Sequence, residues 1–239
     1  MADDVILFSK PYRTAREASN LEQVLASGHI HGDGAFTCEA AAKVSGLVGG
    51  GATLLTTSCT HALEMASILA EVNAGDEVIL PSFTFSSAAT ALALRGARIV
   101  FADIDPLTGN TSADIIEPLI TPRTKAISIV HYAGVGADIE RISALARERG
   151  ILLIEDNAHG LGGSVKGKRL GSFGEFATQS FHDTKNIHCG EGGAIVVNAE
   201  AFRERAEIIR EKGTNRARFL RGQVDKYTWV DLGSSYLPS

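Results

Sequence analysis

The sequence predicts an α/β fold in which helices cover both faces of a mainly parallel central sheet, giving a three-layer α/β/α arrangement. Short runs of β-branched and leucine residues recur with centres about 20 to 28 residues apart, the spacing that a strand plus a crossover helix requires. Most of these runs are apolar at successive positions, which is typical of strands buried on both faces. The expected strands are 52–56, 77–81, 98–103, 125–130, 151–156, 175–181 and 193–198.

Helical patterns fill the intervals between these strands. Thr111 with Asp114 forms a capping-box pattern for the third expected helix, and Asp138 is expected to cap the fourth. Gly213 follows the fifth as a helix stop. The expected helices are 60–72, 84–94, 112–119, 139–149 and 201–212.

Composition limits the function classes. The chain has 239 residues, 44% of them hydrophobic and 21% charged, so it has ample material for a core in one large domain or two small ones. A net charge of -5 gives no electrostatic footprint for nucleic acid or anionic membranes. No signal peptide or apolar stretch of membrane-spanning length is expected, and three cysteines favour a reducing compartment. We therefore expect a cytoplasmic protein without nucleic-acid or membrane partners.

The expected strand 151–156 ends in acidic residues, which follow its apolar run. Asp156 ends this strand, and His159 comes three residues later. Ligands of open α/β sheets bind outside the carboxyl ends of the strands, where an aspartate can pair with a protonated ring nitrogen or a metal. Asp156 could equally cap the next turn, so the residue type alone leaves both interpretations open.

A lysine lies in a polar, glycine-bounded turn between the last two expected strands. Ser180 precedes Lys185 by five residues, and glycines 190, 192 and 193 follow it. Glycines let the backbone approach a bulky ligand, and a lysine amine held in such a site can form a Schiff base. Solvation is the commoner fate of a lysine. The nearby His188 and Cys189 are adjacent and lack a second ligand pair, so no metal site is expected.

Two further segments have the features of a phosphate and ring site. Ser58, Cys59 and Thr60 lie between a strand and a helix, where hydroxyls and free backbone N–H groups can bind an anion or simply cap the helix. Phe85 follows another strand and could cover an aromatic ring, although taken alone it is more typical of a core residue.

Taken together, these elements match the requirements of pyridoxal phosphate: an anion pocket, an aromatic cover, a carboxylate for the pyridine nitrogen, and a lysine for the aldehyde. Other nucleotide-binding folds are disfavoured. No G-x-G-x-x-G follows an expected strand, and no G-x-x-x-x-G-K-[ST] occurs.

The chain resembles the DegT/DnrJ/EryC1/StrS family of sugar aminotransferases, which have the fold type I architecture of pyridoxal-phosphate enzymes. The resemblance runs almost end to end. It is carried by SGHIHGDGAFT (27–37), LTTSCTHALEMA (55–66), GDEVILPSFTFSSAATALALRGARIVFADI (75–104), IVHYAGV (129–135), IEDNAHG (154–160), SFHDTKN (180–186), GEGGA (190–194) and EIIREKGTNRARFLRGQVDKYTW (207–229).

The resemblance implies a role for each candidate residue. Lys185 matches the lysine that holds the cofactor and moves the substrate proton, and Asp156 matches the partner of the pyridinium nitrogen. His159 occupies the place beside the ring oxygen. Four other cofactor-binding positions, together with the helix-start serine, complete the expected set: Ser58, Cys59, Thr60, Phe85 and Ser180. Dehydratases of the family have histidine in place of the lysine, so Lys185 favours transamination.

The resemblance also implies substrates and partners. L-glutamate would donate its amino group to C4 of a dTDP-4-keto-6-deoxyhexose, and the enzyme would be a homodimer. Arg216, Arg218 and Arg221 lie in a basic segment, 203–226, and could meet the nucleotide diphosphate or be solvated. Family members continue into a smaller C-terminal domain, so residues 1–239 are expected to form a large domain truncated before it. Amination at another carbon and a non-catalytic fragment remain as alternatives.

Overall fold

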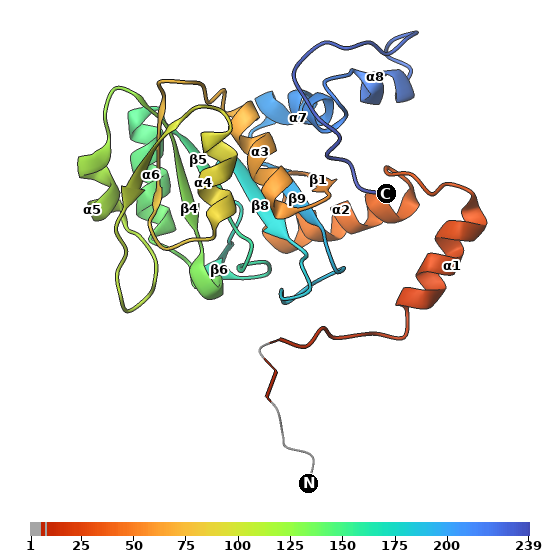
Figure 1. The fold of residues 1–239 in the computed structure, drawn as a ribbon, viewed down its shortest axis with the longest axis horizontal. Coiled ribbons are helices and arrows are strands. Elements are labelled where there is room, and N and C mark those ends of the chain that lie inside the picture. The colour runs from red at the N-terminus through yellow and green to blue at the C-terminus, as the bar shows by residue number, and fades with distance from the viewer. Residues whose placement is uncertain (1–5, 8) are drawn as a thin grey trace.

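The computed structural model describes residues 6, 7 and 9–239, which form a central sheet with helices on both faces (Figure 1). The strands of this sheet are β1 (Ala52–Thr56), β2 (Glu77–Pro81), β3 (Arg98–Ala102), β4 (Thr124–Val130), β5 (Leu152–Asp156), β8 (Phe176–Ser180) and β9 (Gly193–Val197). A small antiparallel hairpin joins β6 (Ser164–Val165) to β7 (Lys168–Arg169). All seven expected strands are present, each within about one residue of its expected bounds.

The sheet is mainly parallel, as the apolar runs predict. Its strand order is β1-β9-β8-β5-β4-β2-β3. Neighbours pair in parallel from β8 through β5, β4 and β2 to β3, whereas β9 runs antiparallel to both β1 and β8. The carboxyl ends of the parallel strands therefore meet at one edge of the sheet, where β9 begins.

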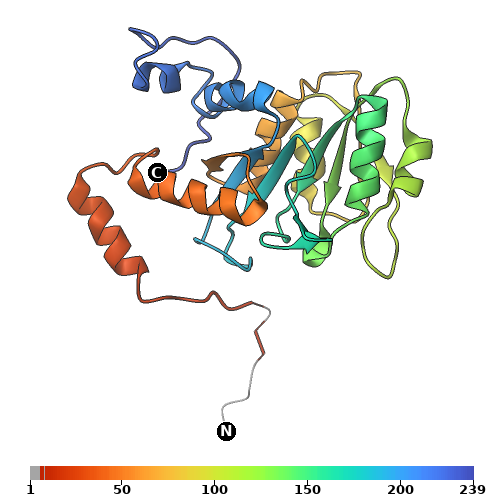
Figure 2. The same cartoon turned by 180° about the vertical axis from the view of Figure 1, so that it is seen from behind.

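The helices divide between the two faces of the sheet. Those longer than one turn are α1 (Glu17–Ser27), α2 (Ala35–Val48), α3 (Cys59–Leu69), α4 (Ser86–Ala93), α6 (Ile139–Arg149), α7 (Arg203–Arg210) and α8 (Arg216–Leu220), and α5 (Ala113–Ile116) is a single turn. One apolar cluster packs α3, α4 and α7 on one face of the sheet (Figure 2). On the opposite face, a second cluster contains residues of α5 and α6, and a third contains residues of α2. The alternation of strand side chains supplies both faces, which confirms the three-layer expectation.

The two predicted helix caps differ from the observed ones. Helix α5 begins after Ser112, and the Thr111 hydroxyl is buried without a hydrogen-bond partner among the described residues, so the capping box is wrong. Asp138 does precede α6, but it makes no cap bond to that helix. Its carboxylate instead accepts from the Ala113 amide at 3.3 Å, so this side chain caps α5, a neighbour that lies far from it in sequence.

The N-terminal helices were not among the expected elements. Helix α1 buries no side chain in the described chain and lies away from the sheet, whereas α2 buries Val44 and Val48 against it (Figure 1). Both end at left-handed glycines, Gly28 and Gly49. Within the described ranges, no helix combines the length and apolarity that a membrane crossing requires.

Candidate active site

The candidate residues gather where β1, β5 and β8 end and β9 begins. Gly193, the first residue of β9, pairs with the last residues of both β1 and β8. A Cβ at Gly193 would lie 2.3 Å from the Ser58 carbonyl carbon and 2.4 Å from the Cys59 nitrogen. Only glycine therefore lets this strand start directly beneath the turn that leads into α3.

The start of α3 presents free backbone donors. Ser58 is the N-cap, and its hydroxyl accepts from the His61 amide at 3.1 Å. The amides of Cys59 and Thr60 donate to no group in the described part of the chain. The Thr60 hydroxyl lies 2.7 Å from the Ser87 hydroxyl at the start of α4. Two free amides with neighbouring hydroxyls at a helix N-terminus suit a phosphate group.

Asp156 is a buried carboxyl group with one oxygen free to bind a ligand. It is 5% exposed, and its Oδ1 accepts from the Ala158 amide at 3.1 Å. No described residue donates to Oδ2. Burial raises the pKa of Asp156, and the hydrogen bond from the Ala158 amide and the positive charge of Lys185 act in the opposite direction. A protonated ring nitrogen would supply both the charge and the donor that this carboxylate lacks.

Two polar side chains lie beside Asp156. Thr178 is its partner on β8, and the Thr178 hydroxyl is buried without a hydrogen-bond partner in the described chain. Burial and the neighbouring Asp156 raise the pKa of the Cys59 thiol, so Cys59 is a neutral neighbour of the site rather than a thiolate nucleophile. Thr178 was not among the expected site residues, although strand alternation places it on the same face as Asp156.

Lys185 lines an open pocket of about 250 Å³ with His159. Tyr132, Ala133, Thr184 and Asn186 complete the lining. These four residues were not among the expected site residues, although Tyr132 and Ala133 follow strand β4 at the same edge of the sheet as Asp156. The structure therefore brings Lys185 and His159 together, as a shared ligand requires.

The ring of His159 has one nitrogen already engaged. Its Nδ1 accepts from the Ala133 amide at 3.2 Å, and the ring meets the Tyr132 ring edge-on at a centroid distance of 5.7 Å. Partial burial and the positive charge of Lys185 both lower the pKa of His159. The imidazole is therefore held in its neutral form more readily than a solvated histidine.

Phe85 and Ser180 differ in their exposure. Phe85 is the N-cap residue of α4 and is 74% exposed, so the expectation that it is a core residue when judged alone is wrong. Ser180 ends β8 and is buried, with the His182 amide 3.4 Å from its hydroxyl. The assigned roles of both residues stay predictions.

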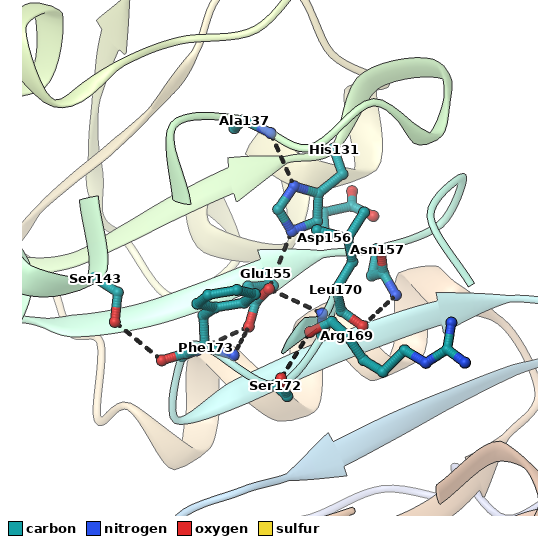
Figure 3. A network of polar contacts seen from close by, with 12 residues as sticks. His131, Ala137, Ser143, Glu155, Asp156, Asn157, Arg169, Leu170, Ser172 and Phe173 are labelled. Carbon is teal, nitrogen blue, oxygen red and sulfur yellow. Dashed lines mark hydrogen bonds and ion pairs between the residues drawn. The ribbon is translucent and has the colours of Figure 1, made fainter. Parts of the chain in front are cut away.

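A second buried carboxylate, Glu155, lies on the opposite face of the sheet (Figure 3). One oxygen accepts from the Phe173 and Gly174 amides, each at 2.7 Å. The other accepts from the Gly171 amide at 2.9 Å and faces Nε2 of His131 at 3.0 Å. Four donors therefore satisfy this carboxylate, which is a structural group and not a ligand-binding one.

The basic segment does not line the Lys185 pocket. Arg216, Arg218 and Arg221 each pair with a glutamate, and Arg221 bonds both oxygens of Glu207 at 2.9 Å. Arg218 and Arg221 line a separate pocket of about 500 Å³ with Glu204 and other residues of α7. Their positive charges are thus matched within the described chain.

Comparison with known proteins identifies the family. The model of the DegT/DnrJ/EryC1/StrS aminotransferase family matches residues 11–236. The chain belongs to this family.

Solved structures agree with that assignment. The aminotransferase TlmJ from Streptoalloteichus hindustanus is 34% identical, with a TM-score of 0.89 over 98% of this chain and 62% of its own. The sugar aminotransferase Spr1654 from Streptococcus pneumoniae, in its PLP-form, is 28% identical, with a TM-score of 0.86 over 98% and 63%. DesI, solved with its TDP-sugar product, is 35% identical, with a TM-score of 0.81 over 87% and 53%.

These relatives fix the fold and the cofactor. The chain has the fold of the aminotransferases, consistent with fold type I, and it spans about 60% of the length of TlmJ and Spr1654. Spr1654 has been solved in both PLP- and PMP-forms, and the family uses pyridoxal phosphate, which is therefore the cofactor of this site. Three features fit that group: the Lys185 pocket, and the Oδ2 of Asp156 and the first amides of α3, which have no partner among the described residues.

Proposed function

We propose that residues 1–239 form the large, cofactor-binding domain of a sugar-nucleotide aminotransferase that works as a homodimer. In the proposed reaction, L-glutamate gives its amino group to C4 of a dTDP-4-keto-6-deoxyhexose, and the keto oxygen leaves the sugar. The products are 2-oxoglutarate and dTDP-4-amino-4,6-dideoxygalactose, the product made by the corresponding transaminase of enterobacterial common antigen synthesis.

The main support for this proposal is the environment of the Asp156 carboxyl group. This carboxyl is buried, its pKa is raised by burial, and one oxygen has no donor within the described residues. An acid kept in this state costs stability unless a ligand uses it. Transamination requires such an acid next to a pyridine nitrogen, because a protonated ring withdraws electrons from the reacting carbon.

The surrounding residues divide the remaining tasks. When bound, pyridoxal phosphate supplies an aldehyde that takes up the amino group and a ring that stores electron density. Lys185 Nζ would hold the aldehyde carbon and would carry a proton to and from the substrate carbon. The Cys59 and Thr60 amides, with Ser58 and Ser180 nearby, would hold the phosphate.

The substrate class is supported by resemblance. DesI, which is 35% identical, was solved with a TDP-sugar product. The C4 position and the product stereochemistry are proposed from segments 27–37 and 207–229, which resemble the transaminase of that activity. In the second segment, Arg216, Arg218 and Arg221 already face glutamates, so we do not assign them to the diphosphate.

The first test is a borohydride reduction of the loaded protein that carries this chain. We expect a reduced pyridoxyl group on the peptide that contains Lys185, found by mass spectrometry, and a visible absorbance band that is lost in Lys185→Ala. Lys43→Ala, an exposed lysine on α2, is the matched control and should keep the band. A label on another lysine, or on none, would overturn the assignment.

The second test identifies the reaction product. The loaded protein is incubated with L-glutamate and a dTDP-4-keto-6-deoxyglucose, and the sugar is analysed by NMR. A 4-amino product of galacto configuration supports the proposal. A gluco product, or turnover of the 3-keto isomer to a 3-amino sugar in place of the 4-keto sugar, would move the protein to another specificity within the family while leaving the cofactor chemistry intact.

A further inference from the structure

Residues 131–137 form a loop that links the buried Glu155 to the candidate active site. His131 is fully buried directly after β4, and Figure 3 shows its ring between Glu155 and Ala137. Its Nδ1 accepts from the Ala137 amide at 3.2 Å, so the ring proton is on Nε2 and is donated to Glu155 at 3.0 Å. Both nitrogens are engaged, and the ring fixes the first residue of the loop to the last.

The middle of the loop is held by a second buried side chain, Asn110. Its Oδ1 accepts from the Tyr132 amide at 2.9 Å, and its Nδ2 donates to the Val135 carbonyl at 3.1 Å. Between these two points the backbone is left-handed at Ala133, with φ of 53°, and at Gly134, with φ of 79°. A non-glycine residue in this region is strained and persists only where its surroundings enforce it.

This conformation aims the Ala133 amide at the active site. The amide donates to Nδ1 of His159 at 3.2 Å. The next residue is glycine, and a Cβ at Gly134 would lie only 2.9 Å from the His159 carbonyl oxygen. Because Nδ1 accepts a hydrogen bond, the proton of a neutral His159 ring is on Nε2. In the described chain no protein group takes that proton, so Nε2 is free to donate to an oxygen of a ligand.

We propose that His131 and Glu155 are positioning residues that fix the tautomer of His159. They act through the 131–137 loop by holding the Ala133 amide on Nδ1, which leaves Nε2–H as a donor toward an anionic ligand oxygen in the Lys185 pocket. The proposal rests on the proposed function only for the identity of that ligand. The tautomer and the loop geometry are properties of the protein alone.

The test is therefore made on the cofactor-free protein by NMR. At a pH where the His159 ring is neutral, long-range ¹H–¹⁵N spectra should show Nε2 protonated and Nδ1 unprotonated. The Ala133 amide should exchange slowly with solvent. In His131→Phe, the side chain can neither accept from the Ala137 amide nor donate to Glu155, and we expect Ala133 exchange to become about tenfold faster, the factor that one hydrogen bond contributes. The His159 spectrum should then show both tautomers.

Ser143→Ala is the matched control. Ser143 donates to the carbonyl of Phe173, whose amide bonds Glu155, at 3.1 Å, but among the described residues it makes no hydrogen bond to the loop. In this variant, the exchange rate of the Ala133 amide and the tautomer of His159 should equal those of the wild type. Wild-type protein with the proton on Nδ1 overturns the proposal even if every His131 variant fails to fold. A folded His131→Phe with an unchanged Ala133 amide overturns it as well. Neither result depends on whether the loaded protein transaminates, so this inference and the proposed function fail separately.

Discussion

Glu155 and Asp156 are adjacent carboxylates that the sheet turns into two different kinds of residue. Both are buried at the end of β5, and strand alternation sends them to opposite faces. Glu155 meets four donors within the described chain, three of them backbone amides of the 171–174 turn. Asp156 meets one, from Ala158, and its other oxygen has no donor among the described residues.

The difference shows how a fold separates support from chemistry. A buried carboxylate that is fully hydrogen-bonded holds the backbone around it, because its donors would be left unpaired without it. A buried carboxylate with a missing donor is destabilising until a ligand supplies one. Stability is therefore expected to depend on Glu155, and cofactor binding on Asp156.

The largest expected effect is on stability in Glu155→Gln. An amide nitrogen cannot accept, so at least one of the backbone amides that Glu155 binds would lose its partner and face another donor. We expect the free energy of unfolding of the cofactor-free protein to fall by about 2–3 kcal/mol, measured by urea denaturation. Asp156→Asn keeps an acceptor for Ala158 and should cost less than about 1 kcal/mol. Equal losses in the two variants would remove the distinction.

The next effect is on cofactor affinity, and it has the opposite ranking. Asp156→Asn replaces a charge-assisted hydrogen bond to a protonated ring nitrogen by a neutral one. We expect pyridoxal phosphate to bind about 10- to 100-fold more weakly, measured by absorbance titration. Ser143→Ala, which is near Glu155 on the other face, should bind the cofactor as the wild type does. Unaltered binding in Asp156→Asn would contradict the assigned role.

The pH dependence of stability sharpens the comparison. Burial raises the pKa of Asp156 above its ordinary value of 3.8. Its contribution to the stability of the cofactor-free protein is therefore fully present below pH 3.8 and is lost as the pH rises through the folded-state pKa. The unfolding free energy of Asp156→Asn minus that of the wild type should rise between pH 3.8 and the folded-state pKa and then level off. If the difference in unfolding free energy does not change with pH, the pKa of Asp156 is not raised by burial as we infer.

Much of this architecture could be predicted from the sequence because it depends on local periodicity. The apolar runs located all seven strands of the main sheet, and two of the expected site residues, His159 and Lys185, line one pocket. The caps could not be located in the same way. Asp138 has the right type and position for α6, but its carboxylate bonds an amide of α5, a choice that only packing decides.

The supporting residues were missed for the same reason. Nothing local distinguishes Glu155 from Asp156, since both follow the same apolar run. Their roles diverge through the 171–174 turn and the 131–137 loop, which reach Glu155 from distant parts of the chain. Helix α1 was also not predicted. It buries no side chain in the described structure, so it has no apolar stripe packed on the sheet that a periodic pattern would indicate.

The smallest expected effect concerns Phe85, which stabilises neither face of the sheet. Because its side chain is 74% exposed at the start of α4, Phe85→Ala should change the unfolding free energy of the cofactor-free protein by less than about 0.5 kcal/mol. If the ring covers the cofactor, the loss of one aromatic contact should weaken cofactor binding by about three- to tenfold. Leu94→Ala, at the other end of the same helix and 68% exposed, is the matched control and should leave binding unchanged. Equal binding in the two variants would assign Phe85 to the surface, and would leave Asp156 as the group on this face that distinguishes a ligand site from a structural one.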